Sequence, residues 1–431
     1  AHPDVLAWDD RGQPRRFGSR RHYCFSSPTY ALHAARITEA VATRYGNNPY
    51  VAAWQTDNEY GCHDTTRSYS EAAAAAFRVW LAQRHGSIEA LNTAWGTVFW
   101  SQEYRGFDEI DLPDRTVTEP NPAHVLDFYR FSSDQVVRFN AAQCRILRRC
   151  SPGRLLIHNF MGFYGSFDHF KVAEDLDVAS WDSYPLGFLD VGPFTDEERK
   201  TFLRQGHPDQ AAFHHDLYRA CGRGRWWVME QQPGPVNWAH HNPAPLPGMV
   251  SLWTWEAMAH GAETVSYFRW RQVPFAQEQQ HAGLLRPDHG ESSAMFEVRI
   301  TASKLTDRAP SQWRPRVALL FSYEALWMFE IQPQGRNFSY WRLMLDWYTA
   351  ARRLALSVDI VNERSDLSQY DVVLIPALPV VPDGLIARLQ ARPEAHVIIG
   401  PRTGCRTPEF QIPSVLALSL IHISEPTRRY E

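Results

Sequence analysis

Short apolar runs that each end in polar or aromatic residues recur along roughly the first 270 residues, separated by stretches with helical spacing. Runs that are apolar throughout are typical of parallel strands covered on both faces. Their polar ends indicate the barrel asymmetry, in which one end of the sheet serves stability and the other carries the chemistry. The runs lie near residues 51, 155, 178, 227 and 265, and helical spacing extends over 29–45, 70–85, 88–95, 123–150 and 249–261. We therefore predict an α/β fold with a (β/α)8 barrel sheet.

The pattern changes beyond about residue 307. Alternating short strands and helices at this spacing predict a small doubly wound α/β domain. No glycine-rich phosphate loop follows the first of these strands, so the sequence does not support nucleotide binding. The predicted strands lie at 317–321, 357–361, 372–375 and 397–399, with helices over 340–354 and 384–389.

Composition excludes several classes of function. The net charge of −4 over 431 residues gives no electrostatic reason to expect a nucleic acid or an anionic membrane as partner. No apolar run reaches the roughly 18 residues that a bilayer span requires. The six cysteines have no CxxC spacing, which favours reduced thiols in a cytoplasmic protein. Aromatic residues make up 13% and include 16 tryptophans, which suits a carbohydrate cleft, although packing accounts for many of them equally well.

Carboxylates at two strand ends are the candidate chemistry. Asn58-Glu59 follows the first run, and Glu230 ends the fourth. A single Asn-Glu pair usually just ends a strand, but two strand-terminal glutamates can share one cleft if their strands share a barrel mouth. Carboxyl groups about 5–5.5 Å apart suit a retaining glycosidase, whereas an inverting enzyme spaces them at about 6.5–9.5 Å. Asn159, Trp181, Asp182 and Tyr184 also follow or end strands and are further candidates for the cleft.

Seven contiguous segments resemble one enzyme family, the glycoside hydrolase family 42 β-galactosidases. The likeness extends from near Phe17 to about Pro413. The segments are TDNEYGCHDT, HNFMGF, SWDSYPLGF, FHHDLYR, WVMEQQPGPVNWA, SLWTWEAMAHGAE and YFRWRQVPFAQEQQHAGL.

The resemblance implies a retaining, exo-acting enzyme on a (β/α)8 barrel. It maps the acid/base onto Glu59 and the nucleophile onto Glu230, and we expect the negative charge of Glu230 to raise the pKa of Glu59. It assigns Arg20, Trp238, Glu278 and His281 to the substrate. We add Asn58, which we expect to bind the sugar 2-hydroxyl, and Tyr184, whose hydroxyl can hold the orientation of the nucleophile. Two alternatives stay open: another retaining barrel glycosidase, such as a β-glucosidase or β-mannanase, and an inactive galactoside-binding fragment.

A metal site of the family is expected to be missing. Many members bind zinc through four cysteines. Here Cys24 matches the first, but Ser68, Ser70 and Ala73 stand at the other three positions. Serine and alanine do not replace thiolates as zinc ligands, so we predict no structural zinc, and we expect no cofactor. Packing and hydrogen bonds must then hold this loop.

The resemblance also predicts how the chain is organised. Five barrel strands are found where eight close a barrel, so we expect an N-terminally truncated catalytic domain over 1–306. An incomplete trimerisation-like domain is expected over 307–415, which implies a homotrimer for the full-length protein. Residues 416–431 fit neither pattern, and we regard them as a non-native tail.

Overall fold

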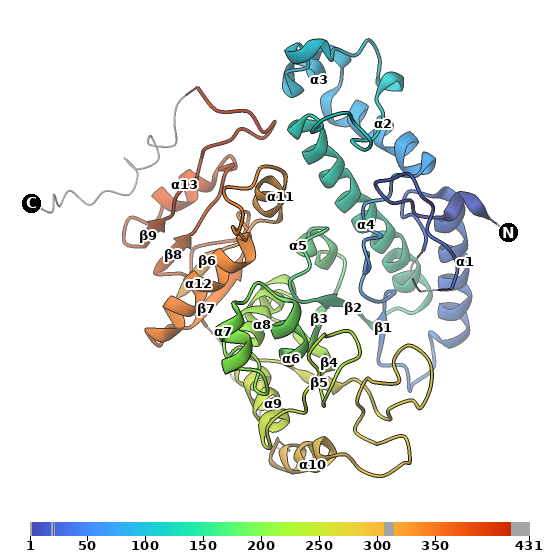
Figure 1. The fold of residues 1–431 in the computed structure, drawn as a ribbon, viewed down its shortest axis with the longest axis vertical. Helices are drawn as coiled ribbons and strands as arrows, with labels where there is room; N and C mark the ends of the chain where they lie inside the picture. The colour runs from blue at the N-terminus through green and yellow to red at the C-terminus, as the bar shows by residue number, and fades with distance from the viewer. Residues whose placement is uncertain (1, 19, 21, 306–313, 415–431) are drawn as a thin grey trace, which may run out of the picture.

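A curled sheet of five parallel strands forms the first part of the protein in the computed structural model, which describes residues 2–18, 20, 22–305 and 314–414 (Figure 1). The strands follow the chain in consecutive order, as in a barrel built from strand–helix units. They are β1 (Ala53–Gln55), β2 (Leu155–Met161), β3 (Val178–Ser183), β4 (Trp226–Gln231) and β5 (Thr264–Tyr267). The predicted barrel architecture and its five strands are confirmed.

Helices cover the outer face of this sheet. The long helix α4 (Pro122–Cys150) runs beside α1 (Pro28–Tyr45), and α8 (Gln210–Cys221) packs behind β3. Each predicted barrel helix is present. The predicted helices not yet named are α2 (Glu71–His85), α3 (Ile88–Trp95) and α9 (Met249–Ala259). The further helices of this part are α5 (His169–Ala173), α6 (Pro185–Val191), α7 (Asp196–Thr201) and α10 (Ser293–Leu305), with the 3-10 turns η1 (Pro3–Val5), η2 (Phe99–Ser101) and η3 (Phe107–Glu109).

A second parallel sheet of four strands follows, in the order β7-β6-β8-β9. Placing the first strand inside the sheet is the doubly wound arrangement, so this prediction is also confirmed. Its elements are β6 (Val317–Leu320), α11 (Tyr323–Ile331), α12 (Tyr340–Arg353), β7 (Val358–Val361), β8 (Val372–Ile375), α13 (Leu385–Gln390) and β9 (His396–Ile399).

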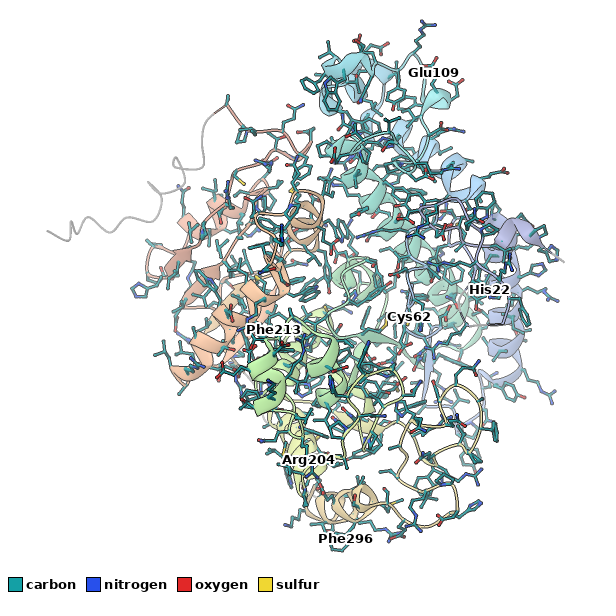
Figure 2. The ribbon with its side chains drawn as sticks, in the orientation of Figure 1. His22, Cys62, Glu109, Arg204, Phe213 and Phe296 are labelled. Atoms are coloured by element: carbon teal, nitrogen blue, oxygen red, sulfur yellow. The ribbon has the colours of Figure 1, made fainter. Side chains whose placement is uncertain are left out.

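The two sheets share a continuous apolar core. Phe213 on α8, labelled in Figure 2, contacts the rings of Trp341 and Tyr348 on α12. The indole of Trp327 on α11 donates a hydrogen bond of 2.6 Å to the carbonyl of Gly165, in the loop after β2. The predicted boundary at residues 306/307 and the predicted tail at 416–431 lie outside the described residues.

The loop around Cys24 is held by hydrogen bonds between buried side chains. Ser70 Oγ donates to Cys24 Sγ at 3.4 Å, and Ser68 Oγ donates to Ser70 Oγ at 3.2 Å. Ser70 Oγ also accepts from the amide of Ala73 and caps α2. The four positions that were compared with a zinc site therefore lie together and are connected by hydrogen bonds. They are Cys24, Ser68, Ser70 and Ala73. Within the described residues, no group of three or more His, Cys, Asp or Glu side chains is placed to hold a metal ion.

Each of the six cysteines is a free thiol. Among the helices of the described residues, none combines the length and apolar character needed to cross a membrane.

Candidate active site

The chain reverses sharply after β1, and Glu59 lies in this turn. Asp57 and Glu59 have φ values of 50° and 46°, in the left-handed region that non-glycine residues rarely adopt. At Gly61, with φ of 71°, an added Cβ would lie 1.7 Å from Thr66 Oγ1, so only glycine fits. The amide of Glu59 donates to the carbonyl of Asn159 at 3.0 Å, which ties the turn to β2. Such strained backbone is typical of functional sites.

A β-bulge directs Glu230 toward the interior of the curled sheet. Trp181 pairs with Val228, but the next residue, Asp182, pairs with Glu230, so Met229 is the extra residue. The ring of Trp181 packs on side chains of α8, which identifies that side of the strand as the helix-facing one. Because Asp182 alternates with Trp181, it faces the interior, and the bulge brings Glu230 to the same face.

Hydrogen bonds hold both carboxylates. Asn159 Nδ2 donates to Glu230 Oε1 at 2.9 Å, and the Tyr184 hydroxyl donates to Glu230 Oε2 at 2.5 Å. The Arg20 guanidinium donates to Glu59, whose side chain is almost fully buried. Each glutamate therefore has a fixed orientation before any substrate arrives.

The remaining predicted residues continue the same cluster. Arg20 Nη1 lies 3.8 Å from Glu278 Oε1, and Arg269 Nη1 donates to Glu278 Oε2 at 2.8 Å. The Tyr184 ring meets the rings of Trp238 and His281 edge-on, with centroids 5.5 Å apart in both pairs. Trp238 keeps 38% of its surface exposed, so an indole side is available to a ligand. The sequence-predicted residues Arg20, Asn58, Glu59, Tyr184, Glu230, Trp238, Glu278 and His281 are thus linked through direct contacts or through Asn159.

Burial controls the protonation of this cluster. Burial and the charge of Glu59 raise the pKa of Glu230 to about 7, and burial together with the charges of Glu59 and Glu230 raises the pKa of Asp182 well above its usual range. Burial also raises the pKa of Tyr184, so its hydroxyl stays a donor. The pKa of Glu230 rises because this carboxyl group is buried beside two others, those of Glu59 and Asp182.

Three contributors were not among the predicted substrate-binding or catalytic residues. Asn159 and Asp182 were flagged only as strand-end candidates, and both face the interior. Arg269, which pairs with Glu278, follows β5 without any signal in the local pattern. Trp181, also a candidate for the cleft, was wrongly placed there, since it faces α8.

Two glutamates at the carboxyl ends of parallel barrel strands, surrounded by aromatic and polar side chains, define the class of carbohydrate-active barrel sites with two carboxylates. Comparison with known proteins agrees with this class. Residues 1–307 match the family model described as β-galactosidase, and residues 315–421 match that described as the β-galactosidase trimerisation domain.

Individual relatives are similar over nearly the whole chain. A β-galactosidase of Thermus thermophilus is 57% identical over 416 residues, which cover 96% of this chain and 64% of the relative. One from Halorubrum lacusprofundi is 44% identical, covering 95% of this chain and 59% of the relative. The crystal structure of the β-galactosidase from the psychrophilic Marinomonas ef1 aligns with a TM-score of 0.93 at 55% identity, covering 96% of this chain and 65% of that one.

The chain belongs to glycoside hydrolase family 42. It spans 64% of the length of the Thermus thermophilus relative.

Proposed function

We propose that this chain carries the active site of a retaining β-galactosidase, which releases terminal β-D-galactose from β-galactosides. The observation that carries the proposal is the pair Glu59 and Glu230, held at the ends of β1 and β4 and linked through Asn159. The three relatives described above are named β-galactosidases. The activity of the whole protein is part of this proposal.

The proposed reaction has two displacements. Glu230 attacks the anomeric carbon, and the bond to the leaving oxygen breaks as Glu59 gives that oxygen its proton. This forms a galactosyl ester on Glu230. Glu59, now ionised, takes a proton from water, whose oxygen attacks the anomeric carbon and releases Glu230. The first step requires Glu230 ionised and Glu59 protonated. We propose that substrate binding moves a proton from Glu230 to Glu59. Arg20 donates to Glu59 but also lies close to Glu278, so it can bind Glu278 and the sugar instead and leave Glu59 free to take the proton.

The other residues have proposed roles in recognition. Trp238 stacks on the apolar face of galactose, and Glu278 and His281 accept or donate hydrogen bonds to vicinal hydroxyls, including the axial one. Burial lowers the pKa of His281, which favours a neutral imidazole able to do both. Tyr184 orients Glu230, and Asn58 binds the 2-hydroxyl, a contact that strengthens in the transition state.

Replacing each glutamate tests the proposed roles. E230A is expected to lower the turnover of a nitrophenyl β-galactoside by about 10⁴-fold or more, because the attacking group is lost. E59A is expected to lose less on this substrate than on lactose, since nitrophenolate leaves without a proton. E263A, which removes a glutamate paired with Arg225 outside the cluster, serves as control.

Turnover near that of the wild type in E230A or E59A would contradict the assignment. A substrate panel decides the sugar: preference for a nitrophenyl glucoside or mannoside over the galactoside would favour one of the other retaining barrel glycosidases.

We also propose the organisation of the longer protein. A division near residues 306/307, with the second domain mediating a homotrimer, is supported by the separate family matches to residues 1–307 and 315–421. Light scattering would report the mass of the assembly. A cytoplasmic location is proposed because six free cysteines suit a reducing compartment.

A further inference from the structure

One asparagine on β2 contacts three parts of the site at once. Asn159 Nδ2 donates to Glu230 Oε1 at 2.9 Å and to Asn58 Oδ1 at 3.0 Å. Its carbonyl accepts from the amide of Glu59 at 3.0 Å. The side chain is fully buried, so packing fixes its position. A single residue therefore joins the strand end that carries Glu59 to the strand that carries Glu230.

The contact with Glu230 completes the support of that carboxylate. Tyr184 holds Oε2, and Asn159 holds Oε1, so rotation of the carboxylate would break one hydrogen bond or the other. A donor also favours the ionised form of a carboxyl group. Asn159 thus acts against the burial and the neighbouring charge that favour a protonated Glu230.

The contact with Asn58 determines which end of its amide faces outward. Asn58 Oδ1 accepts from both Asn159 Nδ2 and Gln55 Nε2, the latter at 2.9 Å. With its oxygen engaged by two donors, the Asn58 amide turns its Nδ2 away from β2. That orientation presents a donor to the oxygen of a sugar 2-hydroxyl.

We propose that Asn159 is a positioning residue, which through one amide nitrogen sets both the carboxylate of Glu230 and the amide of Asn58 in the orientation that the first displacement requires. This inference rests on the proposed function, because it assigns Glu230 as the attacking group and Asn58 as the ligand of the 2-hydroxyl. Asn159 itself acts through these two residues.

Two substitutions test the inference by different means. N159A removes the donor, and N159D keeps the shape but places an oxygen against Glu230 Oε1 and Asn58 Oδ1. Both are expected to lower kcat for a nitrophenyl β-galactoside by about 10- to 100-fold, the usual effect of misplacing a reacting group, with a much smaller change in KM. The acid limb of the pH profile is expected to move to higher pH, further in N159D than in N159A.

The matched control is S180A. Ser180 is the register partner of Asn159 on β3, is equally buried, and donates to the carbonyl of His158 at 2.9 Å without contacting the carboxylates in the structure. S180A therefore removes a buried polar group from the same face of the sheet, as N159A does. S180A is expected to keep kcat within about threefold of the wild type and to leave the acid limb in place.

A second measurement does not depend on turnover. The carboxyl signal of Glu230, assigned with E230Q in protein labelled with ¹³C-glutamate, reports its titration directly. Its midpoint is expected to rise by about one pH unit in N159A and more in N159D, and to stay unchanged in S180A.

The outcomes separate the two proposals. If the wild type hydrolyses the galactoside and E230A does not, while N159A and N159D match S180A in kcat and in the titration, the inference is overturned and the proposed function stands. If the wild type does not hydrolyse the galactoside, the proposed function fails, and the titration midpoints alone decide whether Asn159 controls Glu230.

Discussion

At the residue scale, the ionisation of Glu230 links the proposed reaction to the stability of the fold. Its pKa rises from the ordinary 4.5 to about 7 in the folded protein. Between these values the folded state binds a proton that the unfolded state has released. The free energy of unfolding therefore falls as pH rises through this window, and a charged Glu230 destabilises the fold at pH 8. A carboxyl group that is costly to bury in its charged form is the kind of strain that active sites carry, and the proposed reaction uses that charged form as the nucleophile.

E230Q isolates this effect, because glutamine stays neutral at every pH. We expect E230Q to raise the free energy of unfolding by about 1–3 kcal/mol at pH 8 and to change it little at pH 4, where Glu230 is protonated in both states. Urea unfolding at both pH values measures the difference.

The control, E263Q, should change stability in the opposite direction. The hydrogen bond from Arg225 lowers the pKa of Glu263, so its charge favours the folded state, and loss of that charge should destabilise the protein at pH 8. Equal urea midpoints for E230Q and the wild type at both pH values would contradict the origin assigned to the raised pKa.

Strand-end carboxylates could be located from the sequence, but their environment could not. Simple alternation along β4 places Glu230 on the same face as Val228, away from the interior, and only the bulge at Met229 reverses this. The double role of Asn159 depends on the registers of three strand pairs, which together connect β1 to β4. The pairing of Arg269 with Glu278 depends on the path of a loop, which no periodicity encodes.

At the scale of elements, the α2 cap combines two functions. Ser70 accepts from the Ala73 amide at the first turn of the helix and donates to Cys24 Sγ, which fastens the helix to the loop near the start of the chain. The serine that stands at a position of the family's zinc ligands therefore also begins a helix. These hydrogen bonds connect the loop around Cys24 to the first turn of α2.

S70A tests this arrangement. Removal of the hydroxyl leaves the Ala73 amide uncapped in a buried place, and we expect a loss of about 1–2 kcal/mol in the free energy of unfolding, measured in urea. S87A removes the cap of α3 at the surface, where water replaces it, and should cost less. Addition of EDTA should change neither the wild type nor S70A. A fall in the wild-type midpoint with EDTA would show that a metal holds the loop.

Most elements with a clear apolar pattern were predictable, whereas several other helices were not. The five barrel strands and the helices α1, α4 and α12 follow from apolar patterning that extends over many residues. Helices α5, α6, α7, α10 and α11 were missed. The local signal for α7 existed, since Thr195 and Glu198 form a capping box. For α11, burial on nearly all sides leaves no alternation of apolar and polar residues to detect.

At the scale of the whole molecule, a buried network of charges joins the barrel to the second domain. Arg219 on α8 contacts Asp216 Oδ1 at 2.5 Å and Asp359 Oδ1, on β7, at 2.6 Å. The Tyr348 hydroxyl of α12 donates to Asp216 Oδ2 at 2.5 Å, and His260 Nδ1 lies 2.7 Å from Asp216 Oδ1. Burial alone would raise the pKa of Asp216, but Arg219 and His260 outweigh it and lower the pKa to about 2.

Loss of Arg219 leaves Asp216 and Asp359 buried without their shared cation. We therefore expect R219A to lower the free energy of unfolding by about 3–5 kcal/mol at pH 7.5, the usual cost of breaking a buried pair. R225A breaks the half-exposed pair with Glu263 and should cost about 1 kcal/mol or less.

The loss in R219A should depend on pH. In R219A the pKa of Asp216 rises, so the carboxyl group can become neutral in mild acid, and the difference in the free energy of unfolding between R219A and the wild type should narrow at pH 4.5. Urea unfolding of the wild type, R219A and R225A at both pH values measures these differences. Equal losses in R219A and R225A, or a difference that widens in acid, would mean that this network does not hold the two domains together.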